Sequence, residues 1–188
     1  MLKTRSLLAL FLSLFLFNTS FGVNNKVTNE QLLNQSKALT VVYPDSSMLL
    51  ARRAITLAQQ ANDPLLLTKS HHQLGYVLYS INRYDEAEQQ FNLSISIAQA
   101  EDFKDELALS YNRLGNVHQL RTNYLKALDC YLLALSINRE AKNEPEIART
   151  YVNLANVYST IGQYQRSIEL FLDAMNIHEV TGDRDGLA

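Results

Sequence analysis

Four histidines and one cysteine are the side chains in this 188-residue chain that most readily bind metals or attack substrates. The histidines are His71, His72, His118 and His178. No two of them are four residues apart, the spacing at which two imidazoles on one helix converge on a metal ion. Adjacent His71 and His72 would point about 100° apart on a helix. We therefore expect His71 to be packed, His72 to face a groove, and no metal to be bound.

Cys130 is the only cysteine, so no internal disulfide can form. It lies forty residues from Gln90 and from Leu170, a pattern that predicts a partly buried space-filling side chain rather than a nucleophile. The sequence has no phosphate-binding loop, dinucleotide fingerprint, zincin helix or paired-cysteine signature. These observations indicate that the visible chain is not an enzyme and uses no cofactor.

The charge of the chain is nearly balanced. Lys and Arg number 17 and Asp and Glu number 19, so the formal net charge is −2. Nucleic acids and anionic membrane surfaces attract proteins with a basic excess. Neither is expected to bind this region.

Residues 1–22 differ from the rest and resemble a signal peptide. Lys3 and Arg5 precede an apolar run from Leu7 to Phe17, which is too short to span a bilayer, and small residues offer a cleavage point before Val23. We therefore expect an exported protein, most simply a periplasmic one. The alternative is an uncleaved anchor. Membrane contact is expected only through such an anchor or a carboxyl-terminal span beyond Ala188.

The remaining sequence repeats with a period of 40 residues. Three columns show this period most clearly: a Leu followed by a small residue, a Tyr, and an aromatic residue. The members of these columns are Leu74-Gly75, Leu114-Gly115 and Leu154-Ala155; Tyr84, Tyr124 and Tyr164; and Phe91, Tyr131 and Phe171. The period predicts three similar structural units.

Each unit contains two stretches with apolar residues at helical spacing, separated by a short polar break. The breaks are Asn82-Arg83, Thr122-Asn123 and Gly162-Gln163. Each unit is therefore predicted to be a helical hairpin. The small residues at 75, 115 and 155 indicate that two helices approach closely there, because small residues are otherwise poor choices inside a helix.

These columns resemble the tetratricopeptide repeat over roughly residues 66–180. The 40-residue period is similar to the long subclass found in kinesin light chains, Partner-of-Inscuteable-type adaptors and bacterial sensor proteins. The resemblance implies an all-α fold, a right-handed α-solenoid of antiparallel helical hairpins. Its expected divisions are a signal peptide at 1–22, a degenerate amino-terminal repeat or cap at 23–66, repeats at 67–106, 107–146 and 147–186, and the start of a further repeat at 187–188.

A groove lined by the first helices is the expected binding surface. Its side chains are polar with an aromatic end, and asparagines can hydrogen-bond to an extended peptide backbone. We assign to it Lys69, His72, Tyr76, Tyr79, Asn112, Arg113, Asn116, Gln119, Arg149, Asn153 and Asn156. The other interpretation is an ordinary solvated surface.

The resemblance also implies specific residues. Long-repeat adaptors hold peptides with asparagines, and Asn116, Asn153 and Asn156 match those positions. Tyr76 and Arg113 replace two others, so the asparagine ladder is incomplete. A clamp of several Lys and Arg for a terminal carboxylate is not predicted.

Two functions remain open at this stage. The first is an exported scaffold that binds a protein or an extended peptide segment. The second is the periplasmic sensor region of a longer signalling protein, such as a diguanylate cyclase, histidine kinase or transcriptional regulator. Bacterial sensors of this kind also resemble the Tyr43-Pro44-Asp45-Ser46 segment.

Overall fold

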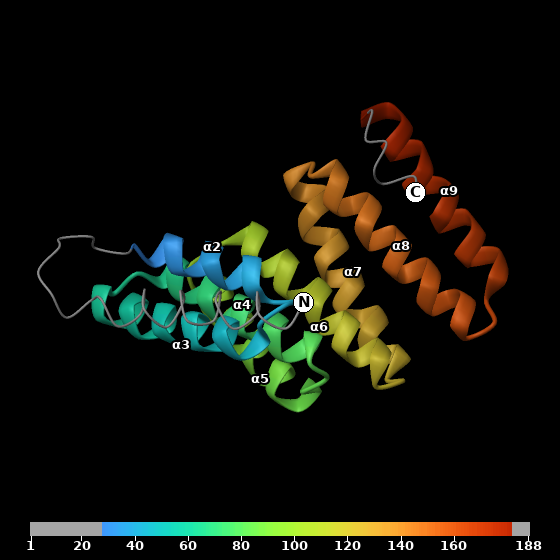
Figure 1. The fold of residues 1–188 in the computed structure, drawn as a ribbon. Helices are drawn as coiled ribbons and strands as arrows, with labels where there is room; N and C mark the ends of the chain where they lie inside the picture. Colours follow the sequence, from blue (N-terminus) through green and yellow to red (C-terminus); the bar gives the residue numbers. More distant parts are fainter. Residues whose placement is uncertain (1–27, 182–188) are drawn as a thin grey trace, which may run out of the picture.

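A computed structural model describes residues 28–181, which form eight α-helices and no strand within that range (Figure 1). The helices are α2 (Asn29–Leu39), α3 (Pro44–Ala61), α4 (Pro64–Ser80), α5 (Tyr84–Ala100), α6 (Lys104–Leu120), α7 (Tyr124–Ala141), α8 (Glu144–Thr160) and α9 (Tyr164–Thr181). The expected signal peptide at 1–22 and the repeat start at 187–188 lie outside these residues. No helix in the described range is long and apolar enough to cross a membrane.

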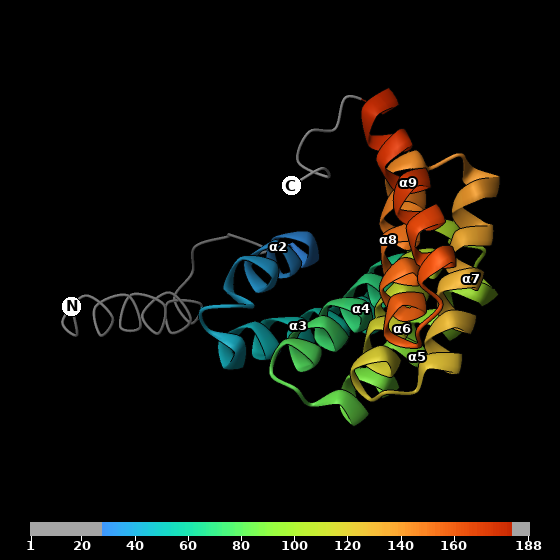
Figure 2. The ribbon, with the colours of Figure 1, turned by 90° about the vertical axis from the view of Figure 1, so that its right-hand side faces the viewer.

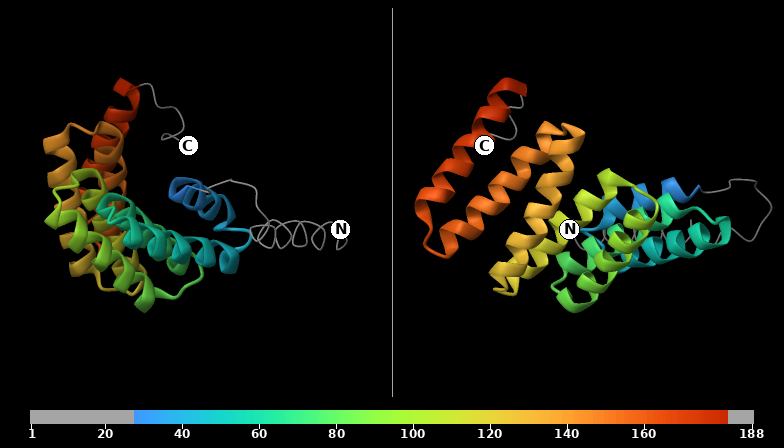
Figure 3. Two further views of the ribbon diagram at one scale, coloured as in Figure 1. Left: turned by 90° about the vertical axis from the view of Figure 1, so that its left-hand side faces the viewer. Right: turned by 180° about the vertical axis from the view of Figure 1, so that it is seen from behind.

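Consecutive helices pair as antiparallel hairpins, and the hairpins stack side by side. The stack rotates along the chain, so that α3 lies across the view in Figure 2 while α8 and α9 stand nearly upright. The two views in Figure 3 show the same curved arrangement. The fold is thus the all-α solenoid that the sequence predicts, and apolar clusters follow one another along it instead of forming one central core.

The turns repeat with the same period as the helices. Inside the hairpins, Asn82, Thr122 and Gly162 have φ values of 62°, 59° and 81°, in the left-handed region. Between hairpins, Asn62, Asp102 and Lys142 have φ values of 50°, 55° and 54°. Asn and Gly adopt such values at low cost, whereas a β-branched residue such as Thr122 does not. Two left-handed residues per repeat therefore reverse the chain.

The helices begin earlier than the repeat boundaries expected from the sequence. Boundaries at 67, 107 and 147 fall inside the first turns of α4, α6 and α8, which begin at Pro64, Lys104 and Glu144. Residues 104–106 and 144–146 are charged apart from one proline, so the first turns of α6 and α8 lack the apolar periodic signal. The first turn of α4 has helix-start features: Pro64 lies in it, and the Asp63 carboxylate accepts a hydrogen bond of 3.0 Å from the Leu66 amide.

The small-residue column lies where the two helices of a hairpin touch, as predicted. A Cβ atom added to Gly75 would lie 2.8 Å from the Phe91 ring, and one added to Gly115 would lie 2.5 Å from the Tyr131 ring. Real Cβ atoms do not approach other atoms so closely. Glycine at these two positions therefore allows the aromatic ring to rest against the backbone.

The last hairpin has an apolar face that the described residues leave open. Phe91 and Tyr131 are fully buried, whereas Phe171 in the same column is 41% exposed. The difference arises because another hairpin packs against α5 and against α7, whereas no described helix follows α9. Around Phe171, α9 also exposes Tyr164, Ile168, Leu172 and Met175.

Candidate functional site

The first helix of each hairpin faces the inner side of the curve. Successive first helices touch one another, because α2 contacts α4, α4 contacts α6 and α6 contacts α8. Among the described residues, no such contact joins α3 with α5, α5 with α7 or α7 with α9. The first helices are thus close together and the second helices are spread apart, as in a curved stack whose first helices line the concave surface.

Most of the side chains assigned to the groove from the sequence reach this surface. The exposed members are Lys69, Arg149 and Asn156, and the partly exposed members are Tyr76, Tyr79, Arg113, Asn116, Gln119 and Asn153. His72 is also partly exposed, but its ring is hydrogen-bonded to the next first helix, whereas Asn112 is buried.

Asn112 was expected on the open face, and this is wrong, because its side chain is only 3% exposed. Its Nδ2 donates a 3.1 Å hydrogen bond to Oγ1 of Thr150 in α8. The Thr150 hydroxyl in turn donates to the Glu146 carbonyl at 2.7 Å. Asn112 therefore belongs to the contact between two first helices, which forms along the inner edge of the stack.

His72 also points toward the next first helix instead of standing free in the groove. Its Nδ1 lies 3.1 Å from the Ser110 hydroxyl, and its ring centroid lies 5.5 Å from that of Phe91. Burial, followed by the positive charges of Arg113 and Lys37, lowers the pKa of His72 to about 3. His72 is therefore neutral, and it occupies the position in α4 that Asn112 occupies in α6.

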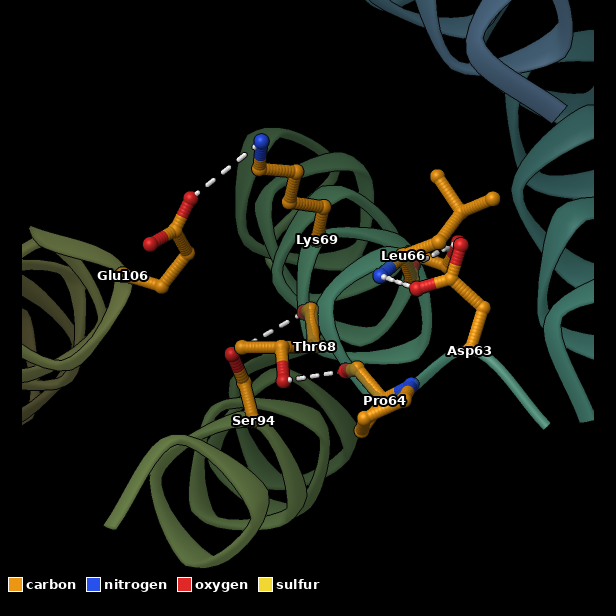
Figure 4. A network of polar contacts seen from close by, with 8 residues as sticks. Asp63, Pro64, Leu66, Thr68, Lys69, Ser94 and Glu106 are labelled. Atoms are coloured by element: carbon orange, nitrogen blue, oxygen red, sulfur yellow. Dashed lines mark hydrogen bonds and ion pairs between the residues drawn. The ribbon is translucent and has the colours of Figure 1, made fainter. Parts of the chain in front are cut away.

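The hydrogen bonds around His72 define its tautomer. The Ser94 hydroxyl donates to the Thr68 carbonyl at 3.0 Å, as Figure 4 shows. Ser94 must then accept from Ser110, 2.9 Å away, and Ser110 must accept from His72. This chain of donors requires the proton on Nδ1 of the imidazole. His71 is packed, as expected, with Nδ1 2.9 Å from Oε1 of Gln90.

Tyr131 fixes two of the groove amides, a role not predicted from the sequence. Its buried hydroxyl lies 2.7 Å from Oδ1 of Asn116 and 2.9 Å from Oε1 of Gln119. A phenol has one proton, so it donates to one oxygen, and the other amide must present its NH₂ group to the phenol oxygen. We assign the shorter contact as donation to Asn116, which leaves the Asn116 NH₂ directed elsewhere. One signal in the sequence could have indicated this role. Among the equivalent positions Phe91, Tyr131 and Phe171, only Tyr131 has a hydroxyl group.

Three cations lie along the groove side of α4, α6 and α8, and two of them have carboxylate partners. Lys69 is 3.4 Å from Glu106, a pair that joins α4 to α6 in Figure 4, and Arg149 is 2.8 Å from Glu146. Arg113 has no hydrogen bond or ion pair with any described residue. Its guanidinium carbon instead lies 4.7 Å from the centroid of the Tyr76 ring.

A cavity extends the surface toward the amino-terminal end. It has a volume of about 610 Å³ and lies between α2 and α4, where Asn34, Lys37, Asp63 and Lys69 contribute polar groups. A degenerate repeat or cap was expected over residues 23–66, with no groove residue assigned to it. Because α2 contacts α4 as the other first helices contact their neighbours, it also lines the candidate site.

The remaining chemistry-bearing residue, Cys130, is buried. Burial, together with the negative charges of Asp129 and Glu88, raises the pKa of its thiol to about 11, so it is protonated at neutral pH. No group of three or more His, Cys, Asp or Glu side chains within residues 28–181 is arranged to hold a metal ion.

Comparison with known protein families agrees with the 40-residue repeat and with the helical fold. Two tetratricopeptide repeat profiles match residues 68–101 and 106–179, which together make up more than half of the chain. The chain belongs to the tetratricopeptide repeat family. No curated protein sequence matches this tetratricopeptide repeat chain.

Several solved structures share the arrangement of hairpins. Aspartyl phosphate phosphatase F from Bacillus subtilis is 18% identical over 88% of this chain and 44% of its own, with a TM-score of 0.81. A Rap protein complexed with competence and sporulation factor is 15% identical over 88% and 47%, with a TM-score of 0.80.

A third similar structure is the Rap conjugation gene regulator of plasmid pLS20 in complex with a Phr peptide. It is 18% identical over 88% of this chain and 46% of its own, with a TM-score of 0.77. This tetratricopeptide repeat chain therefore spans less than half the length of these three proteins, and at such identities the likeness concerns the fold.

Proposed function

We propose that this chain is a non-catalytic scaffold outside the cytoplasm that binds an extended peptide or protein segment along its first helices. The observation that carries the proposal is the fixed position of Asn116 and Gln119, whose amides are held by the Tyr131 hydroxyl. A side chain that is already ordered loses little entropy when a ligand binds. The similar Rap regulator, solved with a Phr peptide, supports a peptide as the ligand class.

The recognition chemistry follows from the carboxamides. Each can donate to a backbone carbonyl and accept from a backbone N–H, so an extended segment can be held largely independently of its sequence. Asn153 and Asn156 in α8 are the best probes, because neither side chain makes a hydrogen bond to another described residue and both reach solvent.

A peptide-binding measurement on matched variants tests this function. The double variant Asn153→Ala with Asn156→Ala should retain fewer peptides from an immobilised random library than the wild type does. Its control is Asn92→Ala with Asn176→Ala, which removes two exposed asparagines from second helices. Equal retention by the two double variants, or no retention by the wild type, would contradict the proposal.

Export is the second part of the proposal. It is supported by Lys3 and Arg5 before the apolar run that ends at Phe17. Residues 1–30 fused to alkaline phosphatase, which is active only after export, should give activity in a bacterial host, and replacing Lys3 and Arg5 by Glu should reduce it. Amino-terminal sequencing of the exported protein should begin at Val23. An inactive fusion would refute export. A protein that is found in the membrane fraction with its amino terminus intact would indicate an uncleaved anchor instead of a cleaved signal peptide.

A further inference from the structure

A row of large apolar side chains on α9 is left uncovered by the described residues, at the end of the stack in Figure 1. The row consists of Tyr164, Ile168, Phe171 and Met175, which are 66%, 54%, 41% and 41% exposed. Spacings of four, three and four residues place these side chains on one face of the helix. Contiguous apolar surface of this kind marks an interaction site in a soluble protein.

The equivalent row is covered in the two preceding second helices. Ile95 and Leu135, at the positions equivalent to Met175, are only 7% and 6% exposed, because α6 packs on α5 and α8 packs on α7. Leu132 and its equivalent Leu172 are both 48% exposed, although α8 covers α7. Leu172 therefore lies beside the contact surface and is not part of the row.

The helices that cover this row in α5 and α7 share one pattern. Each has a branched aliphatic residue, a tyrosine and a leucine at positions i, i+4 and i+7, packed into the same apolar cluster as the row that it covers. These residues are Leu107, Tyr111 and Leu114 in α6, and Ile147, Tyr151 and Leu154 in α8. The row thus fits an amphipathic helix with apolar residues at this spacing.

The polar edge of the row differs between α9 and the earlier helices. In α5, Nε2 of Gln99 donates a 3.2 Å hydrogen bond to the Tyr111 hydroxyl, and in α7, Nη2 of Arg139 donates a 2.6 Å hydrogen bond to the Tyr151 hydroxyl. The equivalent residue in α9 is Glu179, which is exposed and makes no hydrogen bond or ion pair with residues 28–181. A carboxylate only accepts hydrogen bonds. A helix that covers α9 must therefore supply a donor at its i+4 position.

We propose that the α9 row docks an amphipathic helix of a partner protein, with a branched aliphatic residue, a Lys or Arg, and a Leu at positions i, i+4 and i+7. The cation pairs with Glu179, and the aliphatic residues cover the row. Charge favours such a helix, because α9 also carries Glu169 and Asp173 and has only Arg166 to offset them. A second copy of α9 would instead bring another acidic helix. The inference does not rest on the groove function, since the row lies on a second helix.

Binding of helical peptides to the full chain tests the docking surface. The probes are three fluorescent peptides with the 17-residue sequence of α6, one with Tyr111 kept and two with the changes Tyr111→Arg and Tyr111→Glu. The row variant is Ile168→Gln with Met175→Gln. Its matched control is Leu132→Gln with Leu172→Gln, which changes two exposed apolar residues outside the row. Thermal melting checks that each variant folds.

The wild type and the control should bind the Tyr111→Arg peptide saturably, with a Kd below about 1 mM, as measured by fluorescence anisotropy. They should bind it about twofold to fivefold more tightly than the Tyr111→Glu peptide, the usual effect of one exposed charge pair. The row variant should bind at least about tenfold more weakly, because two apolar contacts are lost. Glu179→Lys should reverse the order of the two charged peptides.

Several results would overturn the partner helix. They are the absence of saturable binding to the wild type, equal binding by the row variant, and an unchanged peptide order in Glu179→Lys. Dimerisation in analytical ultracentrifugation that the row variant abolishes would identify a second copy as the occupant. The groove variant Asn153→Ala with Asn156→Ala should bind these peptides as the wild type does. A loss of binding there would place the peptides in the groove and overturn the α9 site while leaving the groove function standing.

Discussion

The ring of Tyr131 rests against the backbone of α6 at Gly115, so closely that a Cβ atom there would lie 2.5 Å from Cε1 of the ring. The hydroxyl of the same residue is hydrogen-bonded to the side chains of Asn116 and Gln119 on the groove side. One aromatic residue of a second helix therefore sets both the separation of the two helices and the position of two amides in the candidate site.

Gly115→Ala should destabilise the protein. Inserting a methyl group into this contact should lower the free energy of unfolding by about 1 to 3 kcal/mol. The higher helix propensity of Ala offsets up to about 1 kcal/mol of that loss. Urea denaturation measures the net loss. The same substitution in a Tyr131→Leu background should cost less, because the smaller side chain leaves room, and an equal cost in both backgrounds would contradict the contact.

Replacing the aromatic residue should have very different effects in two hairpins. Phe91→Ala should reduce the free energy of unfolding by about 3 to 5 kcal/mol, because its ring is fully buried. Phe171→Ala should cost less than half as much, since that ring is 41% exposed. Equal losses in urea denaturation would mean that the α9 face is covered in solution.

Asn112→Ala should reduce stability rather than peptide binding alone. The substitution removes the buried hydrogen bond to Thr150, a loss of about 1 to 3 kcal/mol. Asn156→Ala is the control, because that exposed side chain should change stability by less than about 0.5 kcal/mol. Equal unfolding midpoints for the two variants would contradict the burial of Asn112 and would indicate that its side chain is exposed in the groove.

Thr122→Asn should stabilise the protein. Thr122 is a β-branched residue with a φ of 59°, and Asn82 occupies the equivalent turn with a φ of 62°. Asn tolerates the left-handed region better, so a gain of up to roughly 1 kcal/mol is expected. Thermal melting measures it, and Thr56→Asn in α3 should give no gain because that residue is helical. A lower melting temperature for Thr122→Asn would count against the turn geometry.

Stability should fall as the pH drops below about 6.5, in part because of His72. Its pKa of 6.5 in the unfolded chain is lowered to about 3 in the folded protein, mainly by burial. Between these values the unfolded chain binds the extra proton, so acid favours unfolding, by up to about 2 kcal/mol at pH 5. Burial also lowers the pKa values of His71 and His118, which add to the effect.

Urea denaturation at pH 7.5 and pH 5 measures this dependence. His72→Asn should reduce the difference between the two pH values, and it places in α4 the amide that α6 has at Asn112. An unchanged difference would show that His72 is accessible to protons in the folded state.

The period of 40 residues was sufficient to predict the hairpins, the turns and the small-residue column. Each depends on contacts within one repeat, such as Gly75 with Phe91, and these contacts recur wherever the same residue types recur. The degenerate amino-terminal repeat or cap that the resemblance implies at 23–66 contains α2 and α3 within its described residues.

The groove was harder to predict because it depends on contacts between repeats. A helical periodicity states which residues share a face, but not how far the neighbouring first helix covers that face. For this reason Asn112 and His72 were assigned to the open surface, although Thr150 and Ser110 of the following helices hold them. Tyr131 was missed because its hydroxyl reaches the groove from the other helix of the hairpin.

Each contact between successive first helices uses a different polar pair. Gln73 reaches Ser36 and Thr40 between α2 and α4, and an imidazole–hydroxyl pair and an amide–hydroxyl pair follow at the next two contacts. A hairpin moved to another place in the array would meet a partner suited to a different side chain, and buried polar groups would lose their hydrogen bonds. The buried polar pairs between first helices therefore specify the order of the hairpins. Hairpins with the same backbone fold are not interchangeable within the array.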